Sequence, residues 1–187
     1  MLPHYTRFAD AVSRLRAASS SLSAFTITLK EDKHFLALRN KARSELQTLY
    51  NVIRNHFNMP EIPVYLPARK KIMVRGRAFT HVGMPREIRI YPIHGPAMIQ
   101  YDCWKPQHIL IDSPDSVLET IIHESGHILE AHRYSIMGHE HNFVSAYCEI
   151  ESCLVKIGVV KTIDSSLLRF SGCPDDSYAA TLFGRCA

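Results

Sequence analysis

The stretch IIHESGHILEAH, residues 121–132, places two histidines four positions apart, with a glutamate directly after the first. On an α-helix, positions four apart are rotated by about 40° and separated by about 6 Å, so His123 and His127 project from one face. Neutral imidazole nitrogens bind zinc at about 2.0–2.1 Å, and two such rings can reach one ion. Glu124 then lies beside the ion, where it can take a proton from a water that the metal activates. The spacing predicts zinc bound by His123 and His127, with Glu124 as general base.

The residues before this motif predict that it lies on a helix. Ser113 is a suitable N-cap, and Pro114 suits the first helical position. The apolar residues that would form the buried side of this helix are Val117, Leu118, Ile121, Ile122 and Leu129.

The residues alone leave the third ligand open. His139 lies twelve positions after His127, within the turn MGHEHNF (137–143), and a connection of that length can return a histidine to the helix. His141 is a rival in the same turn. Zincins that use a glutamate from a later helix suggest a further option, Glu149 or Glu151.

These elements resemble the SprT-like (Spartan-related) metallopeptidase family, in which HExxH is followed by a short variable stretch and a His-Gly-x-x-Phe/Trp element. His139 and Phe143 match its histidine and aromatic residue, and Gly138 fits a Gly-His variant. Upstream, NHFNMPEIPVYL, VRGRAFTHVGMPREIRIYP and DSVLETIIHESGH follow the order of the family, so the resemblance covers residues 40–160. It implies that His123, His127 and His139 bind zinc and that Glu124 is catalytic.

Three features depart from this family. Glu140 stands where a glycine usually follows the third histidine, and residues 93–107 look like an inserted loop. The cysteine ribbon that often follows the peptidase core is absent. The first departure keeps His141 as a rival ligand, and the last removes one nucleic-acid-binding or structural module.

The apolar pattern predicts an α+β fold. Helices are expected over residues 5–15, 42–57 and 143–157 in addition to the HExxH helix, and strands over 62–66, 71–74, 87–91 and 108–112. The resemblance implies a zincin-like arrangement, with a small antiparallel or mixed sheet packed against the N-terminal helices and the HExxH helix. We expect an N-terminal helical extension (1–39), a SprT-like core (40–160) and a C-terminal tail packed on the core (161–187).

A basic cluster precedes the HExxH helix. Its members are Arg69, Lys70, Lys71, Arg75, Arg77, Arg86 and Arg89. Such a face could bind DNA phosphates, with an affinity that falls steeply with salt. It could equally be a solvated strand face, or lysines that protect a sheet edge. Tyr101 and Trp104 could stack on bases or pack in the core.

Composition narrows the class of protein. The 187 residues are 46% hydrophobic and 21% charged with a net charge of +4, which is typical of a soluble globular protein. Residues 1–18 lack the apolar core of a secretory signal, and no apolar run suits a membrane span. Five cysteines without a CxxC pair give no disulfide framework, so we expect reduced cysteines in an intracellular, cytoplasmic protein.

These observations predict a zinc-dependent metalloendopeptidase that hydrolyses protein substrates, which by family analogy include DNA-associated proteins. One alternative is a peptidase of a mobile-element or defence system that cuts a single partner without DNA. Another is a non-catalytic protein whose zinc only holds its helices together.

Overall fold

The computed structural model describes residues 3–20, 33–67, 76–91, 93–94 and 110–159. Within these ranges the fold is α+β, with four helices, a small mixed three-stranded sheet and a two-stranded pair. The helices are α1 (Pro3–Ser20), α2 (Lys33–Phe57), α3 (Pro114–Tyr134) and α4 (His141–Lys156). The strands are β1 (Val64–Tyr65), β2 (Gly76–His81), β3 (Met84–Ile90), β4 (Ile93–His94) and β5 (Leu110–Ile111).

The HExxH helix begins and ends through local capping. The Ser113 side chain accepts a hydrogen bond from the Ser116 amide at 3.2 Å, and Pro114 occupies the first turn, as the sequence predicts. At the other end Ser135 adopts the left-handed conformation with φ of 58°, and its amide donates to the Ala131 carbonyl at 2.9 Å. These caps set the length of α3 and the direction in which the chain turns towards α4.

The three-stranded sheet has the order β1-β3-β2, with β1 parallel and β2 antiparallel to β3. The turn of the β2–β3 hairpin is at Val82 and Gly83, which both have positive φ. Pro85 lies inside β3 opposite Thr80, beside an irregularity in the register. β1 pairs only with the far end of β3, so the missing N–H of Pro85 interrupts no β1 ladder.

Side chains of α2 fix strand β1 in place. The Val64 amide donates to Gln47 Oε1 at 2.8 Å, and Gln47 Nε2 donates to the Ile62 carbonyl at 3.1 Å. Arg43 Nε donates to the Val64 carbonyl, also at 3.1 Å. The helix therefore satisfies backbone groups of a short edge strand and protects that edge from other chains.

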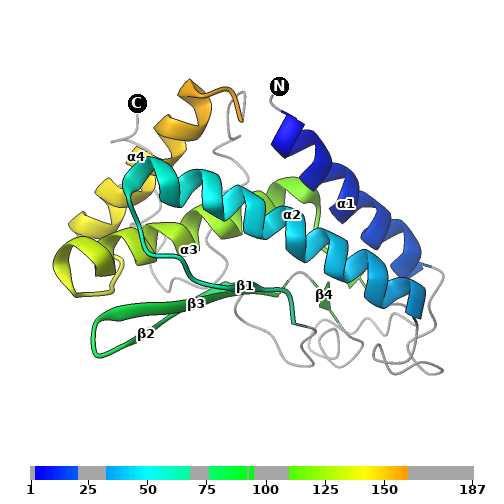
Figure 1. Cartoon of the computed structure of the whole chain (residues 1–187), viewed down its shortest axis with the longest axis horizontal. Coiled ribbons are helices and arrows are strands. Elements are labelled where there is room, and N and C mark those ends of the chain that lie inside the picture. Colours follow the sequence, from blue (N-terminus) through cyan, green and yellow to red (C-terminus); the bar gives the residue numbers. More distant parts are fainter. Residues whose placement is uncertain (1–2, 21–32, 68–75, 92, 95–109, 160–187) are drawn as a thin grey trace, which may run out of the picture.

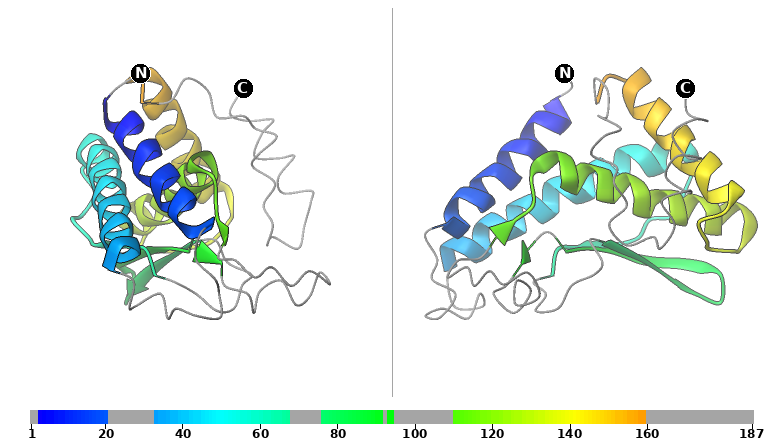
Figure 2. Two further views of the ribbon diagram at one scale, coloured as in Figure 1. Left: turned by 90° about the vertical axis from the view of Figure 1, so that its right-hand side faces the viewer. Right: turned by 180° about the vertical axis from the view of Figure 1, so that it is seen from behind.

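All four helices lie on one side of the three-stranded sheet, and α3 is the central element (Figure 1 and Figure 2). From residue 117 to residue 131, every α3 side chain except the partly exposed His123 is buried. Six of the buried residues are polar or charged: Glu119, Thr120, Glu124, Ser125, His127 and Glu130. Burying polar groups without partners is unfavourable. A central helix with this many buried polar side chains is therefore more typical of a functional site than of a helix that only packs in the core.

The predicted helices are confirmed, but two are longer than predicted. α1, expected over 5–15, continues to Ser20. α2 begins at Lys33, nine residues before the stripe that starts at Ala42, and Phe35 in this added stretch is only 1% exposed. The predicted division between residues 39 and 40 thus lies inside α2. The strand expected at 71–74, most of the 93–107 loop with Tyr101 and Trp104, and the 161–187 tail lie outside the described residues. The division into domains stays a prediction.

Two further predictions concern membrane spans and the state of the cysteines. None of the helices there combines the length and the apolar character that a membrane span requires. Cys148 on α4 is disulfide-bonded, whereas Cys153 is a buried free thiol. The expectation of reduced cysteines is therefore wrong for Cys148, because spacing along the chain cannot show which thiols meet in space. The cytoplasmic location stays a prediction.

Candidate metal centre

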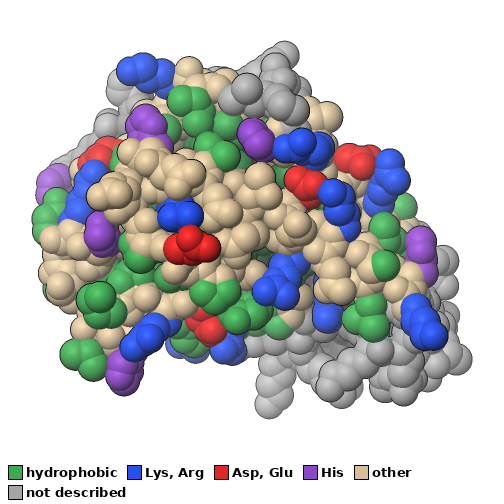
Figure 3. All heavy atoms as spheres, in the orientation of Figure 1, with side chains coloured by type: hydrophobic (Ala, Val, Ile, Leu, Met, Phe, Trp, Pro, Cys, Tyr) green, Lys and Arg blue, Asp and Glu red, His purple; other side chains and the backbone are tan. Residues whose placement is uncertain are grey.

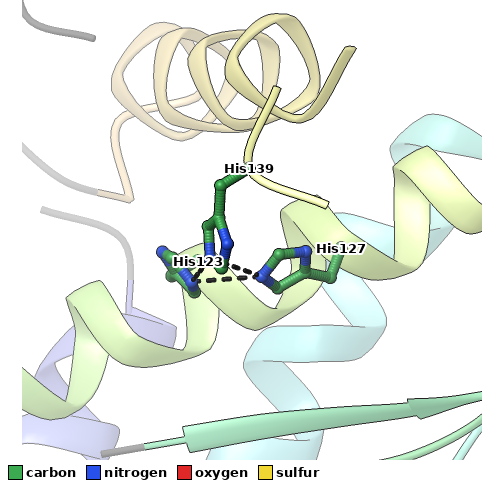
Figure 4. A group of neighbouring side chains, drawn as sticks. All are labelled: His123, His127 and His139. Atoms are coloured by element: carbon green, nitrogen blue, oxygen red, sulfur yellow. Dashed lines mark hydrogen bonds between the residues drawn. The ribbon is translucent and has the colours of Figure 1, made fainter. Parts of the chain in front are cut away.

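Three imidazoles converge at the junction of α3 and α4 (Figure 4). His123 and His127 come from successive turns of α3, and His139 comes from the connection that leads into α4. The Nε2 atom of His127 lies 3.2 Å from that of His123 and 3.2 Å from that of His139, and the third separation is 3.3 Å. The sequence-predicted pair and the predicted third histidine are thus brought together.

These separations fit a tetrahedral metal ion. Two nitrogens bonded to one zinc ion at the tetrahedral angle lie about 3.3 Å apart, given a bond length of about 2.0–2.1 Å. The three Nε2 atoms form a nearly equilateral triangle with this spacing. Each Nε2 of a neutral imidazole is either a donor or an acceptor, so the three contacts cannot all be hydrogen bonds in any combination of tautomers. One cation between the three nitrogens would satisfy all of them, so the arrangement favours a bound ion.

The protonation state of the rings also suits a metal. Burial lowers the pKa of His127 to about 3, and the neighbouring His139 adds to this effect. Burial, followed by the charges that His127 and His139 would carry, holds the pKa of His123 well below its ordinary value. Burial also lowers the pKa of His139. All three rings are therefore neutral at physiological pH, which is the form that binds metals.

The Phe143 ring packs against all three imidazoles. It stacks on His127 with centroids 4.3 Å apart, and it meets His123 and His139 edge-on at 4.8 Å and 5.0 Å. The ring itself is fully buried between α3 and α4. Gly126 allows this close approach, because a Cβ there would lie 3.1 Å from Phe143 Cε2. Phe143 thus limits the orientations of all three imidazoles.

Glu124 projects from α3 towards strand β2 and is 5% exposed. Burial raises its pKa to about 8, although the Ala78 amide, which donates to the carboxylate, and the Arg77 charge act in the opposite direction. A dication close by would also favour the ionised carboxylate. A carboxyl group with a pKa near neutrality is suited to both taking and giving a proton.

Gly76 is required where β2 passes over Glu124. A Cβ at this position would lie 2.6 Å from Thr120 Cγ2 and 2.7 Å from Glu124 Oε1. We expect Gly76→Ala to lower the free energy of unfolding by about 1–3 kcal/mol, because both side chains are held in a buried helix and must shift. Urea unfolding measures this change.

Gly138→Ala is the matched control, since a Cβ there would meet nothing closer than 3.9 Å. Equal stability of the two alanine variants would show that β2 does not press on Glu124.

The rival ligands lie elsewhere. His141 is the first residue of α4, and its side chain is exposed. Among the described residues, the group of converging histidines consists of His123, His127 and His139 and does not include it. Glu149 faces Arg133 instead, and its two carboxylate oxygens accept hydrogen bonds from Nη1 and Nη2 at 2.9 Å each. Glu151 is likewise outside the group.

One buried residue of this region, Glu130, escapes motif matching. It lies seven positions after His123 and three after His127, and is 1% exposed. Positions i, i+4 and i+7 form one stripe on a helix, so the spacing itself is the signal that could have identified it.

The predicted nucleic-acid residues are described only in part. Arg69, Lys70, Lys71 and Arg75 lie outside the described residues. Arg77 and Arg89 are direct cross-strand neighbours on β2 and β3. On the face drawn in Figure 3, basic side chains are spread among acidic and hydrophobic ones rather than gathered in one patch.

Arg77 and Arg89 belong to the sheet face that points away from α3. Both alternate along their strands with the buried residues Ala78, Ile88 and Ile90. The guanidinium carbons lie 5.6 Å and 4.6 Å from the centroid of the Phe79 ring, and Arg89 also pairs with Glu87. Arg77 and Arg89 thus make contacts with other side chains of the sheet, which gives them a role that does not require DNA.

No protein-family model, no curated protein and no solved structure matches this chain. The SprT-like resemblance therefore stays a prediction. What the structure shows directly is an α+β fold in which His123, His127 and His139 lie close enough together to bind a metal ion.

Proposed function

We propose that the chain is a zinc-dependent metallopeptidase of the zincin type, with a SprT-like core. The convergence of the three Nε2 atoms, 3.2–3.3 Å apart, carries this proposal. His123, His127 and His139 are the ligands, and Glu124, adjacent to the first ligand, is the general base. Imidazole also suits copper, iron and nickel, so the assignment of zinc rests on the HExxH pattern.

The size of the ligand set favours catalysis over a purely structural role. Structural zinc sites are closed by four protein ligands, whereas catalytic sites use three and keep one position open. Among the described residues, three histidines form the converging group. The non-catalytic alternative would require a fourth protein ligand.

Each residue then has a definite task in peptide hydrolysis. When bound, zinc supplies a Lewis acid that polarises a carbonyl oxygen and makes water a stronger nucleophile. Glu124 takes the proton of the attacking water and delivers it to the leaving amine, which a single carboxyl group can do when its pKa lies near neutrality. Phe143 keeps the imidazoles oriented and excludes water from behind them.

Exposed apolar side chains near the centre support a polypeptide substrate. Those on the β2–β3 turn and on the segment after α3 are Val82, Met84, Tyr134, Ile136 and Met137. The two segments adjoin, because a Cβ at Gly83 would lie 3.2 Å from the Ser135 carbonyl oxygen. Together they form an apolar surface that leads into the connection carrying His139, and such surfaces are typical of sites that bind protein chains.

Metal dependence of cleavage tests the proposal. The purified chain is expected to cleave an unfolded protein when loaded with zinc, to lose this activity after treatment with a strong chelator, and to regain it when zinc is restored. Gel electrophoresis of the substrate follows the reaction. Cleavage that continues in the metal-free chain would contradict the proposal.

We further propose that the substrates include DNA-associated proteins, and adding DNA to the cleavage reaction tests this. If the basic cluster binds DNA, double-stranded DNA should stimulate cleavage of a DNA-binding protein at low salt, and the stimulation should fall steeply as salt rises. Equal cleavage with and without DNA would instead favour a peptidase that acts on a single partner.

A further inference from the structure

The connection between α3 and α4 is held by a buried carboxylate. Oε2 of Glu130 accepts a hydrogen bond from the Gly138 amide at 2.9 Å, and the Glu130 side chain also accepts one from the Phe143 amide. These two amides lie on either side of His139 along the chain. One side chain of α3 therefore holds both ends of the segment that carries the third histidine.

The Phe143 amide needs such a partner. It belongs to the first turn of α4, where amides have no carbonyl within the helix to bind. Glu140, the N-cap residue of α4, makes no side-chain capping hydrogen bond. Glu130 supplies the cap from the neighbouring helix, and its negative charge is favoured at a helix N-terminus.

We propose that Glu130 is a positioning residue of the metal centre. It is not itself a ligand, because its Oε2 lies 3.9 Å from Nδ1 of His127, the ring nitrogen that does not take part in the triad. By fixing residues 138–143 against α3, it sets the place of the His139 ring relative to the two histidines of the helix. This inference rests on the metal-binding part of the proposed function and not on hydrolysis.

A general role in packing α3 against α4 is the competing explanation, and the structure offers a matched control for it. Glu149 on α4 also links the two helices, through its paired hydrogen bonds with Arg133 on α3. This link is partly exposed and does not involve residues 138–143. Glu130→Ala and Glu149→Ala each remove one carboxylate that joins the helices, but only the first releases the segment that carries His139.

The test measures zinc affinity by competition with a chromophoric chelator, together with amide hydrogen exchange in the metal-free chain. We expect Glu130→Ala to weaken zinc binding by about 10- to 100-fold, the range found when residues that orient metal ligands are replaced. Glu149→Ala should stay within about twofold of the wild type. Exchange at Gly138 and Phe143 should accelerate in Glu130→Ala and remain unchanged in Glu149→Ala.

Two results would overturn the inference: a folded Glu130→Ala variant with wild-type affinity, or equal weakening by both alanine variants. Should Glu130→Ala fail to fold, Glu130→Gln decides. Its amide oxygen can still accept one N–H, so a loss of about 3- to 10-fold is expected, and wild-type affinity would overturn the inference. If wild-type protein binds no zinc, the proposed function fails, whereas the exchange rates still show whether Glu130 holds this segment.

Discussion

Replacing His139 by alanine should lower zinc affinity by about 100- to 1,000-fold, whereas replacing His141 by alanine should leave it unchanged. Structural zinc binding amounts to about 10–16 kcal/mol shared among its ligands, so the loss of one imidazole removes a few kcal/mol. His139 contributes one of the three converging Nε2 atoms, while His141 is exposed on α4 and outside the group. Zinc content after gel filtration in a weak chelator separates the two variants.

The His141 variant is the control for the His139 variant, because the two histidines lie two residues apart in the same turn. Zinc retained by the His139 variant and lost from the His141 variant would move the third ligand by two positions. The triad described above would then not be the metal centre.

Glu124→Gln is expected to keep zinc bound and to reduce cleavage by about 10²- to 10⁴-fold, the usual contribution of a general base. Glutamine has nearly the same shape, and its oxygen can still accept the Ala78 amide hydrogen bond, but it cannot take a proton from water. Thermal stability should be unchanged or higher, because a neutral amide avoids the burial of a charge. Zinc content, cleavage rate and thermal unfolding of one preparation test all three expectations.

Full cleavage by the glutamine variant would remove Glu124 from the mechanism. A different outcome would favour the structural alternative: wild-type chain that cleaves no protein under any condition, but unfolds when zinc is removed. Zinc would then act only to hold α3 and α4 together.

The helix that carries His123 and His127 is the part of the site that the sequence determines most fully. The four-residue spacing, the Ser113 cap and Pro114 fix their shared face through local geometry. The third histidine is different, because a connection of this length can return either His139 or His141 to the helix. The choice depends on where α4 begins and on how the segment before it is held, and both depend on tertiary contacts.

The contacts around Glu124 could not be derived from the sequence for the same reason. The apolar run 71–74 suggested a strand, but the strand that the structure shows beside Glu124 is β2, which begins at Gly76. Its position is fixed by pairing with β3, where Ala78 lies opposite Ile88, and by the lack of a side chain at Gly76. Pairing of this kind is non-local, so apolar periodicity along one segment does not reveal it.

Anomalous X-ray diffraction at the zinc edge, from crystals of the zinc-loaded chain, would locate the bound ion without reference to any motif. We expect one strong anomalous peak about 2.0–2.1 Å from Nε2 of each of His123, His127 and His139. A peak on other residues, or three imidazoles that do not meet at one point, would contradict this expectation.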